Sequence, residues 1–100
     1  MNDIEWLAKW YQSNCDGSWE HSYGIKIETL DNPGWHVKID LSETDDFDVM
    51  AQEFSEDLDD NNWVDCSISN GIFNGYGDCM KLERIIRIFK SWIKSDKLTH

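Results

Sequence analysis

Two alternating runs of residues flank a tight turn, and this pattern restricts the possible folds more than any other in the chain. Residues 23–29 and 35–41 each alternate apolar or β-branched side chains with polar ones or glycine, as half-buried strands do. The sequence Asn32-Pro33-Gly34 between them favours a turn, because proline presets its own φ and glycine accepts a positive φ. The pattern predicts an antiparallel hairpin with one inward face, made of Tyr23, Ile25, Ile27, Thr29, Trp35, Val37, Ile39 and Leu41.

A helix is predicted before this hairpin, over residues 2–14. Asn2 or Asp3 can cap its start. Trp6 and Trp10 lie beside the predicted buried stripe, where they either complete the core or form an exposed pair. The stripe itself follows i, i+3, i+4, i+7 spacing and comprises Ile4, Leu7, Ala8 and Tyr11.

A second helix is predicted over residues 79–95, with Asp78 as its N-cap. Its apolar face consists of Leu82, Ile85, Ile86, Phe89, Trp92 and Ile93. The opposite face carries Arg84, Arg87, Lys90 and Lys94.

The middle of the chain predicts further strands. A weakly patterned third strand is expected around residues 48–55, followed by a polar turn over 57–62 and a fourth strand through Trp63, Cys66 and Ile68. Asn70-Gly71 signals a tight hairpin, and a short fifth strand should follow at 72–74, with the sheet ending at 75–78. The order predicts a single α+β domain over residues 1–100. In it, an antiparallel sheet of four or five strands forms a meander, with both helices on one face.

Charge is unevenly distributed along the chain. The net charge is −11, and the segment from Ile39 to Met80 has no Lys or Arg. Phosphate backbones and anionic membranes require a positive face, so neither nucleic acid nor a membrane is an expected partner. A basic protein partner suits this field, although acidity can also serve solubility alone. The segment contains twelve acids: Asp40, Glu43, Asp45, Asp46, Asp48, Glu53, Glu56, Asp57, Asp59, Asp60, Asp65 and Asp78.

The chain shows no membrane-length apolar run and no signal-peptide core near its N-terminus, so we expect a cytoplasmic protein. Its three cysteines, Cys15, Cys66 and Cys79, are odd in number and widely spaced. Free thiols in a reducing compartment are the simplest interpretation.

No metal or cofactor is expected. The cysteines and histidines form no C-x₂-C or H-x₃-H pair. Asp57, Asp59 and Asn61 imitate the start of a calcium loop, but Asn62 and Ile68 stand where that loop needs Gly and Glu.

Trp19-Glu20-His21 is interpreted as the start of the first strand, with Trp19 packed under the first helix. In a strand, Glu20 and His21 point to opposite faces, so they cannot share a proton on one surface. The chain also lacks a nucleophile elbow, a phosphate loop and a dinucleotide fingerprint. A non-enzyme is therefore expected. The alternative is a small enzyme or sulfur-handling accessory protein that uses Cys15, Glu20 or His21.

A protein-docking surface is the favoured functional interpretation. Twelve like charges in one segment repel one another, and a basic partner would relieve that repulsion. Trp19, Trp35, Phe47 and Trp63 are either binding anchors or buried rings. The candidate partner-binding residues are Glu20, His21, Asp45, Asp46, Asp48, Glu56, Asp57, Asp59, Asp60 and Trp63.

The first 45 residues resemble the immunity protein 53 family of bacterial polymorphic toxin systems. The family's W-L-x-x-W-Y helix matches at Trp6, Leu7, Trp10 and Tyr11. Its C-[DN]-G-x-W-E-H segment matches at Cys15, Asp16, Gly17, Trp19, Glu20 and His21. Its G-I-x-I-x-T-L-D-N-P-G-W hairpin matches at Gly24, Ile25, Ile27, Thr29, Leu30, Asp31, Asn32, Pro33, Gly34 and Trp35.

The closing segment LERIIRIFKSW, residues 82–92, is also similar to the family's C-terminus, whereas residues 46–78 fit only in outline. The resemblance implies a small cytoplasmic protein that is encoded beside a toxin, binds it and neutralises it without catalysis of its own. It assigns no binding residues. From the charge we expect a basic toxin, for which a nuclease-type domain is attractive, and we expect the immunity protein to be a monomer or weak homodimer.

Overall fold

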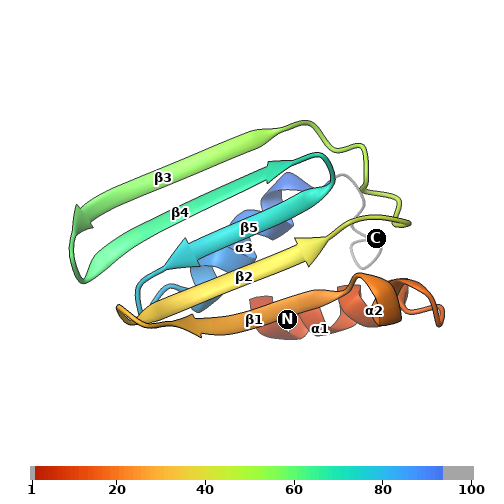
Figure 1. Ribbon diagram of the computed structural model, residues 1–100, viewed down its shortest axis with the longest axis horizontal. Coiled ribbons are helices and arrows are strands. Elements are labelled where there is room, and N and C mark those ends of the chain that lie inside the picture. The colour runs from red at the N-terminus through yellow and green to blue at the C-terminus, as the bar shows by residue number, and fades with distance from the viewer. Residues whose placement is uncertain (1, 94–100) are drawn as a thin grey trace.

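The computed structural model describes residues 2–93, and in this range the chain forms three helices and one five-stranded antiparallel sheet (Figure 1). The two long helices lie on the same face of the sheet, so the predicted α+β architecture is confirmed. The elements are α1 Asp3–Asn14, α2 Trp19–Ser22, β1 Ile25–Leu30, β2 Gly34–Asp40, β3 Gln52–Asp59, β4 Asn62–Ser69, β5 Ile72–Gly77 and α3 Leu82–Trp92.

The sheet joins a hairpin to a three-stranded meander, in the order β1-β2-β5-β4-β3. The β1–β2 hairpin closes with Leu30 opposite Gly34, as the turn sequence predicts. Residues 41–51 then carry the chain to the far edge of the sheet, where β3 begins. The meander returns through β4 to β5, which pairs with β2. At the β4–β5 turn Asn70 and Gly71 have φ of 52° and 76°, which confirms the predicted tight hairpin.

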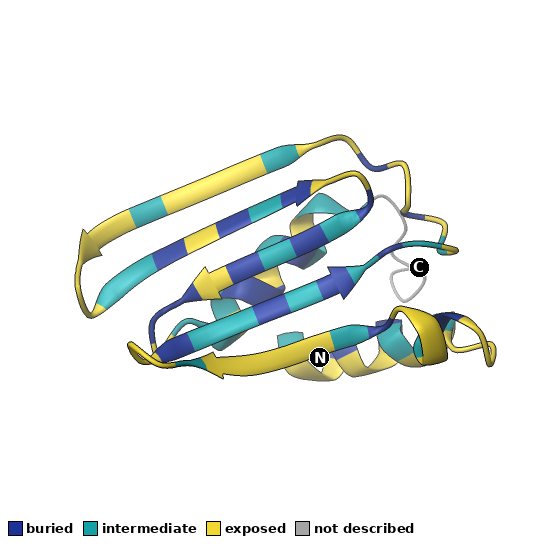
Figure 2. Cartoon of the chain, in the orientation of Figure 1, coloured by how far each residue is buried: buried dark blue, intermediate teal, exposed yellow. Residues whose placement is uncertain are grey.

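The core fills the space between the sheet and the two long helices (Figure 2). The predicted inward residues Val37, Ile39 and Leu41 are fully buried. The apolar face of α3 is confirmed as well, since Ile85, Ile86 and Phe89 are buried, and Leu82, Trp92 and Ile93 pack against the core. Lys94, placed on the other face of this helix by the sequence pattern, lies outside the described residues.

Three tryptophans form the aromatic centre of this core. Trp6, Trp10 and Trp19 are at most 2% exposed. The Trp10 ring centroid lies 5.7 Å from that of Trp19 and 5.1 Å from that of Phe89, both with edge-on geometry. Trp6 and Trp10 therefore complete the core and do not form an exposed pair. The predicted packing of Trp19 under the first helix is confirmed.

The predicted buried stripe of α1 is partly wrong. Leu7 is buried, but Ile4 is 47% exposed and Ala8 is also exposed. The helix turns its two indoles inward because they bury more apolar surface than Ile4 and Ala8 would. The cap is as predicted, since the Asn2 side chain accepts a hydrogen bond from the Glu5 backbone N–H at 2.7 Å.

The predicted inward face of the first strand is also partly wrong. Ile25 packs against the core, but Ile27 is 43% exposed and Thr29 is exposed. Tyr23 precedes β1 and is exposed. The reason is position, because β1 is an edge strand and is exposed along most of its length (Figure 2).

Several element boundaries differ from the sequence prediction. The third strand spans residues 52–59 in place of 48–55, so the polar turn shortens to Asp60-Asn61. The fifth strand continues through residues 75–77, which had been assigned to the end of the sheet. The last helix begins at Leu82, three residues later than predicted, and its N-cap is Lys81, not Asp78.

Candidate functional site

One face of the sheet is left uncovered by the long helices, and we call it the open face. Antiparallel register fixes which side chains it presents. Val37, Gly75 and Cys66 lie opposite one another on the helix side, so their neighbours along each strand point the other way. One row of the open face therefore crosses the whole sheet, through Glu28, His36, Tyr76, Asp65 and Ser55.

The centre of the open face carries an ordered aromatic pair. The rings of His36 and Tyr76 stack with centroids 4.3 Å apart and planes inclined by 6°. His36 Nε2 lies 2.9 Å from Asn74 Oδ1, which fixes the imidazole from a second direction. Tyr76 remains 37% exposed. Half-buried Trp63 is on the same face of the next strand. Aromatic rings that are already held in place can contact a partner with little loss of side-chain entropy on binding.

The outer strand β3 and its turn carry the densest exposed charge. We call Glu53, Glu56, Asp57, Asp59 and Asp60 the acidic edge. Figure 2 shows β3 exposed along most of its length, because it lies at the margin of the sheet.

The inward side of β3 also reaches solvent. Phe54 and Leu58 are 37% and 64% exposed. The Arg84 guanidinium lies 5.5 Å from the Phe54 ring centroid and 2.9 Å from the Glu56 carboxylate. Arg84 is thus the contact by which α3 reaches this strand.

The cations of the last helix leave most of the acidic edge uncompensated. Arg87 pairs with Asp3 on α1 and with Glu83, at 2.9 Å and 3.1 Å. Lys81 pairs with Asp78 at 2.7 Å. Across residues 2–93, no ion pair with Lys or Arg involves Glu53, Asp57, Asp59, Asp60 or Asp65.

The predicted partner-binding residues fall at two opposite ends of the strands (Figure 1). The β3–β4 hairpin end brings together Glu56, Asp57, Asp59, Asp60 and Trp63. The other end has the β2–β3 connection and α2, with Asp45, Asp46, Asp48, Glu20 and His21. Asp46 is 1% exposed, so its side chain is buried and is not accessible to a partner in this structure.

Trp19-Glu20-His21 does not begin a strand, and that prediction is wrong. The segment is a short helical turn, so the opposite-face argument for Glu20 and His21 does not apply to it. Glu20 accepts hydrogen bonds from the backbone N–H groups of Asp16 and Gly17 at 2.9 Å and 2.6 Å. Asp16 accepts in turn from Ser18 and Trp19. These two carboxylates stabilise the turn, and the exposed His21 lies beside them.

The pKa values of both carboxyls follow from this turn. Hydrogen bonds from the Trp19 and Ser18 backbone lower the pKa of Asp16. The pKa of Glu20 is lowered chiefly by the hydrogen bond from its own backbone N–H, assisted by those of Asp16 and Gly17 against some desolvation. These hydrogen bonds give the two acids a structural role, because they fix the backbone that leads into the buried Trp19. The Trp19 indole completes the anchor by donating to the Asp40 carbonyl at 2.8 Å.

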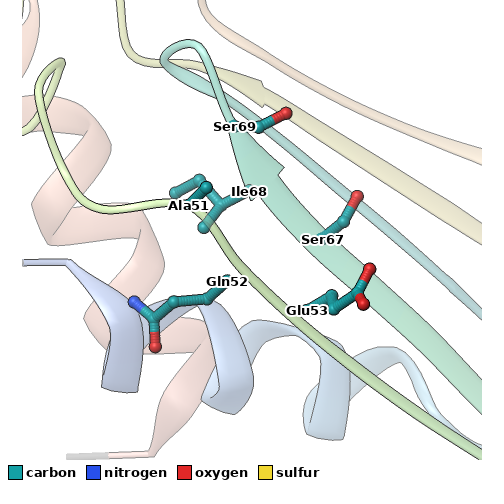
Figure 3. Close-up of a pocket in the computed structure, with 6 residues that line it drawn as sticks. All are labelled: Ala51, Gln52, Glu53, Ser67, Ile68 and Ser69. Atoms are coloured by element: carbon teal, nitrogen blue, oxygen red, sulfur yellow. The ribbon is translucent and has the colours of Figure 1, made fainter.

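The open face and the acidic edge are flanked by a shallow hollow of about 360 Å³ (Figure 3). It lies where β3 begins beside the end of β4, and Gln52 extends toward the helix layer while Ser67 and Glu53 point away from it. Nowhere in residues 2–93 do three or more His, Cys, Asp or Glu side chains gather as a set that could hold a metal ion. No helix in the described part of the chain is long and apolar enough to cross a membrane.

Two residues of this surface are not among those that the sequence pattern selects as candidates. The pattern assigns Tyr76 to the end of the sheet, between Gly75 and Gly77, and His36 to the polar side of a strand. Their pairing depends on β2 lying next to β5, which are separated by more than 30 residues of chain. Alternation of residues 72–77 is the available signal, since Phe73 and Gly75 face inward and Asn74 and Tyr76 alternate with them on the open face.

Comparison with known proteins shows the family of this chain. The model of the family described as immunity protein 53 matches residues 4–94, nearly the whole chain. No curated protein and no solved structure matches this sequence significantly. The match includes the middle of the chain, with the strand β3 that carries the acidic edge, for which the sequence resemblance holds only in outline. The chain belongs to the immunity protein 53 family.

Proposed function

We propose that this immunity protein neutralises a basic cognate toxin domain by binding it through the acidic edge and the adjoining part of the open face. The family assigns the class of partner, a toxin. The observation that carries the proposal is the row of acids on β3, which lies beside half-buried Trp63. Within the described chain Arg84 pairs with Glu56, and the other acids of this row have no ion pair with Lys or Arg. Opposite charge speeds encounter and rejects wrong partners, while a central ring supplies affinity.

A nuclease-type toxin is the specific partner that this charge favours. Enzymes that act on nucleic acid need a positive cleft for the phosphate backbone. An acidic surface with projecting aromatic rings can occupy such a cleft and exclude the substrate. On this proposal the immunity protein acts in the cytoplasm, as a monomer or weak homodimer, with neither a cofactor nor chemistry of its own.

The test is a charge reversal at the hairpin end of the acidic edge. Asp57→Lys with Asp60→Lys should weaken binding to the toxin domain encoded beside this gene by about tenfold or more at low salt, since each reversed rim charge changes attraction into repulsion. Asp59 is left in place because its carboxylate accepts from the Asn61 backbone at 2.8 Å and holds the turn. Titration calorimetry at two salt concentrations measures the loss of affinity and shows how far salt screens the change in charge.

The matched control is Glu5→Lys with Glu83→Lys, which makes the same change in net charge on the helix layer, behind the sheet. This control should keep its affinity within about threefold, because it alters ion pairs within the helix layer and no charge on the proposed toxin-binding surface. Both double variants must retain cooperative melting. Equal losses in the two variants would mean that only net charge matters, and no loss in either would exclude the acidic edge. Protection of DNA or RNA from the toxin decides whether the toxin is a nuclease.

A further inference from the structure

Within residues 2–93, the outer edge of β3 is an unused half of a hydrogen-bonding ladder. In this described range β3 is the last strand of the sheet order and pairs only with β4. With eight residues it presents an edge about 27 Å long. Natural proteins usually shorten, cover or charge such an edge, because it can template pairing with another chain.

Register identifies which residues of β3 direct their backbone outward. The Asp78 N–H donates to the Trp63 carbonyl, so Trp63 directs its backbone toward β5. Alternation along an antiparallel strand then directs the backbone of Val64, Cys66 and Ile68 toward β3. Their partners Glu56, Phe54 and Gln52 therefore hydrogen-bond to β4 through their own backbone N–H and C=O groups.

The backbone groups of Glu53, Ser55 and Asp57 consequently face outward. Each offers one N–H and one C=O at the free edge. The same three residues have their side chains on the open face, so the edge and the acidic surface are one continuous site.

Charge decides between the two possible occupants of this edge. A second copy of the chain would place β3 against β3 and bring Glu53, Glu56 and Asp57 close to the same acids of the copy. Like charges opposite one another destabilise a strand pair. A strand from a basic partner would instead place its cations among these carboxylates and its apolar side chains near exposed Phe54 and Leu58.

We propose that the toxin adds an extended, Lys- or Arg-containing segment to β3 as a sixth strand of the sheet. This inference rests on the proposed function, because it specifies how the toxin engages the acidic edge. Backbone pairing through residues 53, 55 and 57 supplies affinity, and the alternating acids select a basic segment. The shallow hollow at Gln52 and Glu53 lies at the start of that strand, where a side chain of the added segment can be received.

The decisive variant is Ser55→Pro. Proline removes an outward N–H and blocks close approach of a new strand, while the ladder to β4 does not use that N–H. Affinity for the neighbouring-gene toxin domain should fall by at least about tenfold, the effect of losing one or more backbone hydrogen bonds together with strand approach. Ser55→Ala keeps the N–H and should bind within about twofold of the unchanged protein.

Amide hydrogen exchange gives a second measurement that needs no variant. In the free protein the N–H groups of Glu53, Ser55 and Asp57 should exchange quickly, and those of Phe54 and Glu56 slowly. On toxin binding the first three should become protected. This readout still decides the matter if Ser55→Pro fails to fold.

The outcomes separate this inference from the proposed function. If the unchanged protein does not bind the toxin domain, the proposed function fails. If it binds, but Ser55→Pro binds equally well and the three amides stay unprotected, only the added strand is overturned. A second copy of the chain would occupy β3 if the three amides were protected without toxin, if this protection rose with protein concentration, and if light scattering gave the mass of a dimer. That result would also overturn the added toxin strand.

Discussion

At the scale of single residues, Asp78 illustrates how one buried acid can join three parts of the chain. Its carboxylate accepts from the backbone N–H groups of Trp63 and Met80, at 2.9 Å and 2.8 Å, and from Lys81 Nζ at 2.7 Å. Desolvation alone would raise the pKa of Asp78, but the Lys81 hydrogen bond and the two backbone bonds outweigh it and lower the pKa to about 2. The residue predicted as a helix cap instead fastens β4 to the start of α3.

Replacing Asp78 by Ala should destabilise the fold by about 3 kcal/mol, because it removes the counter-ion of Lys81 and the acceptor of the Trp63 N–H in a buried setting, although Lys81 keeps its hydrogen bond to Asn62. The exposed Asp60→Ala should change stability by less than about 0.5 kcal/mol. Urea unfolding of both variants measures the difference.

The same contact gives a pH dependence with a definite sign. Because the pKa of Asp78 is depressed on folding, its contribution is fully present above about pH 4 and is lost as the pH falls toward 2. Asp78→Ala should therefore lose less stability than the unchanged protein between pH 5 and 2. If both proteins lost the same free energy of unfolding over this pH range, the depressed pKa of Asp78 would be contradicted.

The three cysteines differ in environment, which allows a test of the sulfur-handling alternative. Burial, with help from the charge of Asp65, raises the pKa of the Cys66 thiol to about 12. Cys15 and Cys79 are exposed. A disulfide reagent at pH 8 should label two thiols per native chain and three after unfolding, because the thiolate is the reactive form. Rapid labelling of Cys15 at pH 6 would instead indicate an activated nucleophile and would support the alternative.

At the scale of elements, two glycines set how closely α3 packs on the sheet. A Cβ at Gly75 would collide with the Ile85 side chain, and one at Gly77 would contact Lys81 at 2.7 Å. Gly75→Ala should destabilise the protein by about 1–3 kcal/mol through overpacking, since the helix must move away or Ile85 must leave its rotamer. Thermal melting checks this. A melting temperature equal to that of the unchanged protein would show that the helix shifts freely.

Elements with a clear turn sequence or apolar periodicity can be predicted from the sequence, whereas features that depend on packing between distant segments cannot. The hairpin at Asn32-Pro33-Gly34, the Asn70-Gly71 turn and the apolar face of α3 follow from local chemistry alone. The exposure of Ile27 depends on where the helices end over the sheet. The sequence pattern ends the sheet at Gly75 because it does not reveal the helix that packs on this glycine.

The candidate site shows the same division. Acids at 56–60 and Trp63 were selected from the sequence, and the structure gathers them at one hairpin end. Their separation from Asp45 and Asp48 required knowledge of the path between β2 and β3. The stacking of His36 on Tyr76 required the order of the strands.

At the scale of the whole molecule, the protein separates its charges. Cations of α3 and acids of α1 bind the helix layer together, through Arg87 with Asp3 and through Lys90 over the Trp6 ring at 5.4 Å. Uncompensated acids collect on the opposite margin, along β3. The molecule measures 40 × 28 × 24 Å, so a partner at that margin can bind without disturbing the tryptophan cluster beneath the other strands.

The ion pair between Asp3 and Arg87 has a consequence for synthesis, because it links positions 84 residues apart. The first helix leaves the ribosome long before α3, and its indoles have no Phe89 to pack against until residue 89 has also emerged. Closure of the helix layer must therefore follow release of α3. Immunity can begin only after α3 has been translated, so a premature stop before Arg87 should abolish protection as completely as loss of the gene.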